Sequence, residues 1–232
     1  MVEVGGRPVL WHIMKILGSQ GITEFVICAG YKSEYIKNYF YNYGASNLDF
    51  TVKLGDQSST VFHGSHEEFN WTVTVADTGE ATMTGGRIKM IEKYVEGQPF
   101  LATYGDGIAD INLGALLEFH NSHGKIATMT VTQPTSRFGV VDVNPSGFVS
   151  QFREKPKVND WINMGFFVFE NDIFNYLEND SVLEEAPLRA LAVENQLGAY
   201  RHYGFWQPMD TYREFLALND LWTSSNPPWK TW

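Results

Sequence analysis

Apolar side chains recur every three or four positions between residues 8 and 21, and the run ends at a glycine. This spacing places them on one face of an amphipathic helix. Residues 22–31 form a mostly apolar run with a glycine at position 30, which is typical of a strand covered on both faces. Residues 33–44 return to helical spacing and begin at a serine that can cap the helix. The order helix, strand, helix predicts a parallel α/β sheet.

The middle of the chain mixes alternating and helical patterns. Residues 48–55 and 71–79 alternate apolar and polar positions and predict strands, whereas the polar residues 56–70 show no clear period and predict a long loop or flap. The elements expected next are a helix over 84–95, a strand over 99–110 that runs into an acidic turn, a helix over 112–124 capped by Asn112 and stopped by Gly124, and a strand over 125–133.

The second half begins with two alternating segments that flank an Asn-Pro-Ser-Gly sequence, so residues 137–156 predict a β-hairpin. The remaining expected elements are a strand over 161–170, two helices that end near residue 196, a strand over 197–210 that enters a loop, and a helix over 211–222. The whole pattern predicts an α/β fold with a doubly wound core and added hairpin elements in the second half.

The amino-acid composition limits which partners the protein can bind and in which cellular compartment it is expected. The 232 residues are 44% hydrophobic, enough for one large domain, and the net charge of −10 argues against nonspecific binding to nucleic acid. A nucleotide ligand stays possible, because Mg²⁺ and a few basic side chains can balance its charge. The single cysteine, Cys28, excludes an intrachain disulfide, favours a reducing compartment and is expected as a buried strand residue. No 18-residue apolar run or signal peptide occurs, so we expect a cytoplasmic protein without a membrane partner.

Two acidic turns are candidates for metal chemistry. Asp106 lies between two glycines, where a hydrated Mg²⁺ and a phosphate could approach, and Asp210 lies in a second loop further along the chain. In α/β sheets, ligands bind at the carboxyl ends of strands, which is where both turns are expected. Each aspartate could instead cap the helix that follows it. The absence of His and Cys clusters favours magnesium over zinc.

Two basic residues are candidates for phosphate contacts. Arg87 lies in a Gly-containing segment that opens a helix, where backbone N–H groups favour an anion and the guanidinium could bind a phosphate in bidentate fashion. Lys155 follows a strand and precedes Pro156, so it could contact a sugar phosphate. An ordinary exposed lysine is the alternative interpretation at that position.

Taken together, these segments closely resemble the sugar-phosphate nucleotidyltransferase family over residues 1–232. The matching stretches are DTGEATMTGGR (77–87), TYGDGIADI (103–111), FREKP (152–156), NMGFFVFE (163–170), GFWQPMDT (204–211) and PPWKTW (227–232). Two of these strings, GFWQPMDT (204–211) and PWKTW (228–232), resemble the cytidylyl branch of the family. The resemblance implies a Rossmann-like doubly wound mixed sheet with helices on both faces. It implies one domain over 1–232, with a nucleotide-binding part at 1–135 and a sugar-binding and C-terminal part at 136–232.

The resemblance also implies a reaction and its residues. A cytidylyl group would pass from CTP to α-D-glucose 1-phosphate by in-line attack on the α-phosphorus, with Mg²⁺ as cofactor, giving CDP-glucose and pyrophosphate. Asp106 and Asp210 would bind the magnesium and, with Lys155, form the catalytic set. The implied nucleotide contacts are Thr82, Arg87 and Gly105. The implied sugar-phosphate contacts are Lys155, Asn163, Gly165 and Glu154, with Arg137 as a further member of the glucose pocket.

The start of the chain departs from the family pattern. The family begins with a strand and a G-G-x-G-T-R loop that grips the triphosphate, and this sequence begins after them, so we expect the fold without its first strand and an impaired activity. A misassigned start, a truncation and a non-catalytic homologue that binds a sugar nucleotide stay open as explanations. Use of another pyrimidine nucleotide is a further alternative. Relatives form homo-oligomers, and we expect one here.

Overall fold

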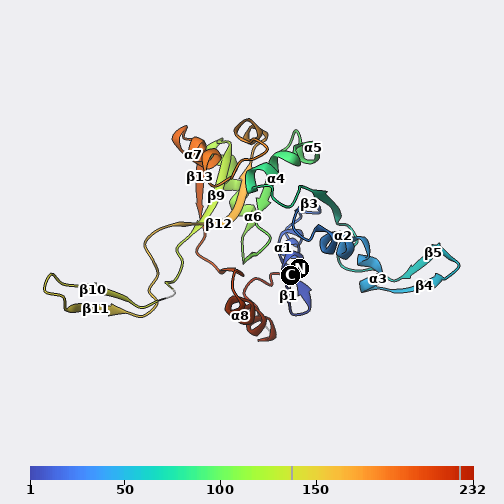
Figure 1. The fold of residues 1–232 in the computed structure, drawn as a ribbon, viewed down its shortest axis with the longest axis horizontal. Coiled ribbons are helices and arrows are strands. Elements are labelled where there is room, and N and C mark those ends of the chain that lie inside the picture. Colours follow the sequence, from blue (N-terminus) through green and yellow to red (C-terminus); the bar gives the residue numbers. More distant parts are fainter. Residues whose placement is uncertain (137, 225) are drawn as a thin grey trace.

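The computed structural model describes residues 1–136, 138–224 and 226–232, and a four-stranded mixed sheet forms its centre (Figure 1). The strand order is β13 (Leu197–Arg201), β9 (Ala127–Thr132), β12 (Ile162–Phe169) and β7 (Phe100–Thr103). β13 runs parallel to β9, while β12 is antiparallel to both β9 and β7. Since β7 and β9 precede residue 136 and the other two strands follow it, both parts of the chain contribute to one sheet.

Strand β12 separates two hydrophobic cores because its side chains alternate between the faces of the sheet. Met164, Phe166 and Val168 face a core that includes the first helix, α1 (Val9–Gly18). Phe167 and Phe169 face a second core formed with the 3₁₀ helix η1 (Asn171–Tyr176) and α7 (Ala186–Val193). The expected arrangement of helices on both faces is therefore present.

A separate two-stranded parallel sheet consists of β3 (Glu24–Ala29) and β6 (Thr72–Asp77). Helix α1 is buried along most of its length, and α2 (Ser33–Tyr41) contacts β6 before the short helix α3 (Tyr43–Asn47) begins. The expected serine cap is wrong, because Ser33 is already helical and the capping position is occupied by Lys32 in a left-handed conformation.

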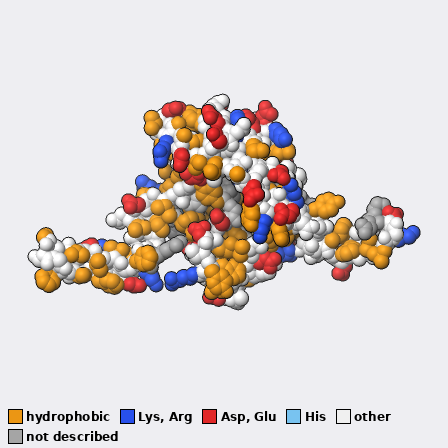
Figure 2. Space-filling model, in the orientation of Figure 1, with side chains coloured by type: hydrophobic (Ala, Val, Ile, Leu, Met, Phe, Trp, Pro, Cys, Tyr) orange, Lys and Arg blue, Asp and Glu red, His pale blue; other side chains and the backbone are white. Residues whose placement is uncertain are grey.

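Two β-hairpins project from opposite sides of the molecule (Figure 1). The first pairs β4 (Asp49–Lys53) with β5 (Asp56–His63), so the prediction of a loop over all of 56–70 is wrong. Cross-strand pairs such as Phe50 with Phe62 stabilise β5 although its own sequence is polar. The second pairs β10 (Val140–Val143) with β11 (Val149–Arg153), as expected. Hydrophobic side chains are visible along both hairpins in Figure 2.

The remaining helices agree with the sequence pattern in part. The helix expected over 84–95 is divided into α4 (Thr84–Met90) and α5 (Glu92–Val95), and the first of the two helices expected before residue 196 is the 3₁₀ helix η1. Helix α6 (Leu113–His123) is confirmed, with Asn112 accepting a hydrogen bond from the backbone of Ala115 and Gly124 in a left-handed conformation. The last helix is α8 (Tyr212–Thr223).

Two further strand pairs, each made of short strands, lie outside the four-stranded sheet. β1 (Glu3–Val4) and β2 (Arg7–Pro8) form a tight turn, and β8 (Gly107–Ala109) pairs antiparallel with β14 (Trp206–Pro208). Near the C-terminus Trp229 is fully buried, and its indole N–H donates to Nδ1 of His12 in α1 at 3.4 Å. Within the described residues, no helix has the length and apolar character needed to cross a membrane.

Candidate active site

The pairing of β8 with β14 brings Asp106 and Asp210 to the same end of a strand pair. Pro208 is opposite Gly107, and the Met209 N–H donates to the Asp106 carbonyl oxygen at 2.9 Å. Asp106 therefore directly precedes the paired residue Gly107, and Asp210 directly follows Met209. The β-ladder thus places two carboxylates that are far apart in the sequence next to each other.

Neither aspartate caps a helix with its side chain. Asn112 caps α6, and the hydroxyl of Thr211 caps α8 in a capping box with Glu214. The carboxylate of Glu214 also accepts from the backbone N–H of Asp210, at 3.0 Å. The capping interpretation of the two aspartates is therefore wrong, and their side-chain oxygens are left for another role.

The electrostatics of the pair fit a cation. Partial burial and the negative charge of Asp210 raise the pKa of Asp106, although its side chain still reaches solvent. Within the described residues, neither carboxylate forms an ion pair with Lys or Arg, and no group of three or more His, Cys, Asp or Glu could hold a metal. The protein can thus supply two carboxylate ligands, and phosphate oxygens and waters would complete a Mg²⁺ shell.

The backbone beside the carboxylates is open. A methyl group placed on Gly105 would meet no atom within 4 Å, so there is free space above this part of the chain. In contrast, a methyl group on Gly107 would lie 3.4 Å from the indole nitrogen of Trp206. Gly105 therefore lies where a ligand could approach the backbone closely.

Arg87 is held inside the loop that precedes α4. Its guanidinium donates to the Thr78 hydroxyl at 2.7 Å and to the Glu80 carbonyl at 3.2 Å, and it packs on Gly30 so closely that a Cβ there would lie 2.3 Å from Nη1. The guanidinium thus orders the loop that contains Thr82, which is half-buried. This structural role was not expected from the sequence.

The start of α4 is closed rather than open to an anion. The Gly86 N–H donates to the Ser181 carbonyl at 3.0 Å, and a Cβ on Gly85 would lie 2.8 Å from Cβ of Ser181. The glycines therefore allow the 178–185 segment to pack against the helix. The expectation that backbone N–H groups at this helix start favour an anion is not supported by this packing.

Glu154 and Lys155 lie at the base of the β10–β11 hairpin, and both side chains are exposed. The Lys155 amine is 3.8 Å from the Glu154 carboxylate and forms no ion pair with Asp106 or Asp210. Lys155 has a φ of 44°, a left-handed conformation that is uncommon for a residue with a side chain. Arg137, expected in the glucose pocket, lies outside the described residues.

Asn163 and Gly165, both in β12, surround a residue that sequence reasoning missed. The Asn163 amide donates to the Tyr104 hydroxyl at 3.3 Å, and its oxygen accepts from the Gly165 N–H at 2.8 Å. Gly165 has a φ of 85°, and a Cβ there would lie 2.5 Å from the Tyr104 ring. Tyr104 directly precedes Gly105 and Asp106, so the two expected subsites are in contact through its side chain.

Glu184 is the second residue that was missed. It accepts hydrogen bonds from the Tyr104 hydroxyl and from the Thr84 hydroxyl, the latter at 2.7 Å. Nothing in the sequence around Glu184 singles it out, because it is one of two adjacent glutamates in a segment that matches none of the family stretches. Its contacts depend on long-range packing.

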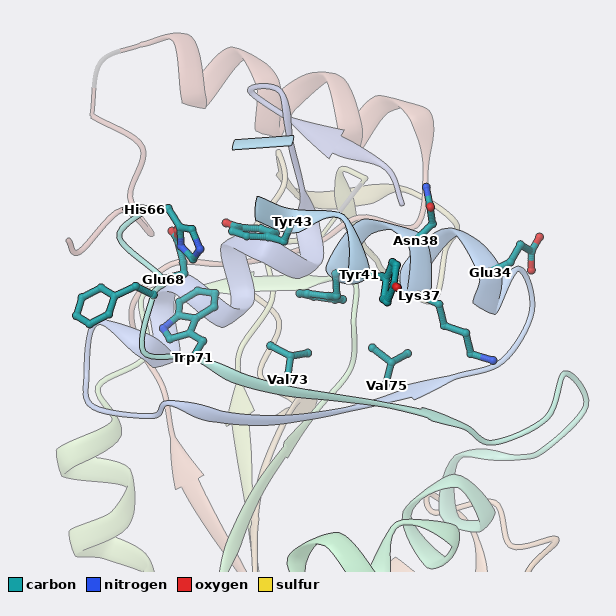
Figure 3. A pocket seen from close by; sticks show the side chains of 12 residues that line it. Glu34, Lys37, Asn38, Tyr41, Tyr43, His66, Glu68, Trp71, Val73 and Val75 are labelled. Carbon is teal, nitrogen blue, oxygen red and sulfur yellow. The ribbon is translucent and has the colours of Figure 1, made fainter. Parts of the chain in front are cut away.

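A cavity of about 760 Å³ lies away from these residues, between α2, β6 and the segment 66–71 (Figure 3). Val73 and Val75 form its floor, and Tyr43, His66 and Trp71 lie around one end. None of the residues expected to bind substrate lines it. Size alone therefore does not identify the active site, which is instead marked by the paired carboxylates.

Comparison with known proteins shows the family to which the chain belongs. A family model described as "Nucleotidyl transferase" matches residues 1–207. The chain is 46% identical to a glucose-1-phosphate cytidylyltransferase of Salmonella typhimurium, covering 100% of this chain and 90% of that protein. It is 40% identical to a probable glucose-1-phosphate cytidylyltransferase of Bacillus subtilis, covering 100% and 91%.

Two solved structures share the fold. UTP-bound UGPase from Acinetobacter baumannii has a TM-score of 0.68 at 18% identity and covers 99% of this chain and 87% of that one. HddC from Yersinia pseudotuberculosis has a TM-score of 0.67 at 18% identity and covers 96% and 88%. These similarities agree with the α/β architecture predicted from the sequence.

Proposed function

Because the chain belongs to the nucleotidyl transferase family, and within it to the glucose-1-phosphate cytidylyltransferases, we propose that it joins CTP to α-D-glucose 1-phosphate at the Asp106–Asp210 pair. The products are CDP-glucose and pyrophosphate. We place the site at these two carboxylates because they lie next to each other and cap no helix. Among the described residues, neither pairs with a Lys or Arg side chain.

The reaction needs positioning more than covalent help from the protein. A phosphate oxygen of glucose 1-phosphate attacks the α-phosphorus of CTP, and the bond from that phosphorus to the oxygen bridging to the β-phosphorus breaks as pyrophosphate leaves. Asp106 and Asp210 would hold a Mg²⁺ ion, which when bound supplies charge neutralisation at the phosphates. Their mutual repulsion in the free protein supports this role, because a divalent cation removes it.

The nucleotide side of the site is proposed at Thr82, Arg87 and Gly105. Arg87 holds the 78–83 loop through Thr78 and the Glu80 carbonyl, so its contribution to CTP binding includes fixing the shape of this loop. Gly105 supports close approach of the nucleotide, because the space above its backbone is free. These residues all belong to the proposed nucleotide-binding part, 1–135.

The sugar-phosphate side is proposed at Lys155, Glu154, Asn163 and Gly165 in the part 136–232. Asn163 has its amide orientation fixed by two hydrogen bonds, which suits recognition of a sugar hydroxyl. Lys155 is exposed, and among the described residues its amine pairs with no acidic residue other than its neighbour Glu154, so it is available to a phosphate. Its catalytic role is to stabilise charge on the sugar phosphate.

A homo-oligomer and a cytoplasmic location complete the proposal. The β10–β11 hairpin presents Val141, Val143, Val149 and Phe152 at 46–62% exposure, and an isolated two-stranded hairpin is only marginally stable in water. A second copy of the chain would cover such side chains. Cys28 is half-buried rather than fully buried, and burial raises the pKa of its thiol to about 11, which agrees with a structural cysteine. The reducing compartment is supported by the cysteine count, because a single cysteine cannot form an intrachain disulfide.

The experiment that tests the function incubates the chain with CTP, glucose 1-phosphate and MgCl₂ and measures both products. We expect pyrophosphate and CDP-glucose to appear in equal amounts, and to disappear when either substrate or Mg²⁺ is omitted. Parallel reactions with UTP and dTTP define the pyrimidine preference. Binding of CDP-glucose without pyrophosphate release would contradict catalysis and identify a binding homologue.

A further inference from the structure

Glu184 connects two parts of the proposed site that are far apart in the sequence. One carboxylate oxygen accepts from the hydroxyl of Tyr104, which directly precedes Gly105 and Asp106. The other oxygen accepts at 2.7 Å from the hydroxyl of Thr84, the first residue of α4, which follows the nucleotide loop. A single side chain thus bridges the nucleotide loop and the segment that carries the metal-binding aspartate.

Tyr104 extends this bridge to the sugar side. Its hydroxyl accepts from the Asn163 amide at 3.3 Å, and its ring covers Gly165. The directions of the bonds are fixed, because an ionised carboxylate can only accept and the phenol must therefore donate to Glu184.

The backbone around Glu184 is itself fixed to α4. The Leu183 N–H donates to the Thr84 hydroxyl at 2.9 Å, and the Gly86 N–H donates to the Ser181 carbonyl at 3.0 Å. Both donors and both acceptors come from the 178–185 segment and the first turn of α4. These hydrogen bonds therefore fix the backbone that carries the Glu184 side chain, although the side chain itself is exposed.

We propose that Glu184 is a positioning residue, which sets the nucleotide loop at a fixed distance and orientation from the sugar pocket. The proposal rests on the function proposed above. In-line transfer requires the attacking phosphate oxygen and the α-phosphorus to be aligned, and a small misplacement of one substrate lowers the rate strongly. No contact of Glu184 with substrate is needed for this role.

The Glu184→Gln variant tests the bridge without changing the size of the side chain. A carboxylate offers an acceptor oxygen to each of the two hydroxyls, whereas an amide offers one oxygen and one N–H₂ group. Either Tyr104 or Thr84 then loses its acceptor, and the fixed direction of the Asn163–Tyr104–Glu184 chain is lost. We expect the two subsites to remain intact individually but to lose their alignment.

Ligands that occupy one subsite or both distinguish alignment from general damage. Calorimetry would measure binding of CTP for the nucleotide side, of glucose 1-phosphate for the sugar side, and of CDP-glucose for both sides. For Glu184→Gln we expect CDP-glucose to bind roughly tenfold more weakly and kcat to fall by at least as much, while each single-site ligand binds within about threefold of wild type. Equal weakening of all three ligands would overturn the proposal, because it would indicate a structural role.

Matched variants complete the test. Glu185→Gln changes the neighbouring carboxylate, for which no side-chain hydrogen bond occurs among the described residues, and should leave all three affinities unchanged. Tyr104→Phe removes one donor and keeps the carboxylate, so it gives a second route should Glu184→Gln fold poorly. Combining the two substitutions should weaken CDP-glucose binding no further than Glu184→Gln does; multiplicative effects would overturn the proposal.

Different results would contradict the proposed function and the positioning role of Glu184. A wild-type chain that does not bind CDP-glucose overturns the proposed function. A wild-type chain and a Glu184→Gln variant that bind CDP-glucose equally tightly, with equal kcat, overturn the positioning role and leave the proposed function standing.

Discussion

The backbone N–H of Met209 donates to the carbonyl oxygen of Asp106 at 2.9 Å, and this bond continues the β8–β14 ladder by one residue. The two aspartates are therefore adjacent because of main-chain pairing, not because of their own side chains. A substitution of either carboxylate should consequently leave the surrounding backbone in place. This independence makes the pair suitable for mutational tests.

Replacement of Asp106 or Asp210 by Asn is expected to lower kcat by more than about 100-fold, because each substitution removes a charged ligand that stabilises the transition state through the cation. The measurement is pyrophosphate release under saturating CTP and glucose 1-phosphate. Asp49→Asn, in the β4–β5 hairpin, is the matched control and should retain wild-type kcat. Turnover within threefold of wild type in either site variant would contradict the assigned role.

The same pair predicts a link between pH, magnesium and stability. The pKa of Asp106 is raised in the folded protein, so the folded chain binds more protons than the unfolded chain in the window just above the ordinary aspartate pKa. Stability should therefore fall as pH rises through this window. At neutral pH, Mg²⁺ should raise the Tm of the wild-type chain by binding the folded state alone. Thermal unfolding with and without MgCl₂ measures both effects.

Asp210→Asn provides the control for this link. Without the charge at position 210, the pKa of Asp106 should move down toward its ordinary value, as carboxyl chemical shifts in an NMR titration would report. The Tm in the absence of Mg²⁺ should rise slightly, and the increase caused by Mg²⁺ should be lost. An unchanged response to Mg²⁺ would show that the ion binds elsewhere.

Sequence patterning predicts most elements of this fold because apolar spacing reports burial directly. Helix α6 is the clearest case, since Asn112 and Gly124 mark both ends. The hairpin strand β5 was missed because its sequence is polar and its stability comes from cross-strand contacts with β4. The partner strand directly precedes β5, but the polar pattern of β5 alone does not indicate that the two segments pair.

The sequence likewise predicts only part of the candidate site. The two aspartates could be selected from the sequence because each lies in a distinctive turn, but whether they capped helices depended on Asn112 and Thr211. Glu184 could not be selected at all, because its partners Tyr104 and Thr84 are 80 and 100 residues away. Long-range hydrogen bonds of this kind become visible only when the chain is folded.

Gly30→Ala should impair CTP binding without removing any side chain of the site. The added methyl group would lie 2.3 Å from Nη1 of Arg87, so the guanidinium must move away from Thr78 and release the 78–83 loop. We expect the KM for CTP to rise by roughly tenfold, as is typical when a positioning contact is lost. The KM for glucose 1-phosphate should change much less.

Gly55→Ala is the control for this substitution, because a methyl group there meets no atom within 4 Å. It should leave both KM values and the Tm close to wild type. Equal rises in the two KM values for Gly30→Ala would contradict a specific effect on the nucleotide loop.

A charge on the apolar face of the β10–β11 hairpin should weaken self-association. Phe152 is opposite Val141 on that face and is 62% exposed, whereas Gln151 is opposite Asp142 on the polar face. Phe152→Lys should therefore shift the chain toward a smaller species in sedimentation or light scattering, because burying an unpaired charge is costly. Gln151→Lys should not, and equal assembly of both variants would exclude this face as the interface.

Gly165→Ala tests whether the contact of Tyr104 with β12 shapes the sugar pocket. At this position an added methyl group meets two costs, because φ is 85° and the Tyr104 ring would lie 2.5 Å away. Gly97 has a φ of 82° with no atom within 4 Å, so Gly97→Ala measures the conformational cost alone, of about 1–2 kcal/mol. We expect Gly165→Ala to destabilise the chain more than Gly97→Ala does in urea unfolding, and to raise the KM for glucose 1-phosphate. If both variants lose equal stability and keep wild-type KM values, Tyr104 does not depend on Gly165 for its position.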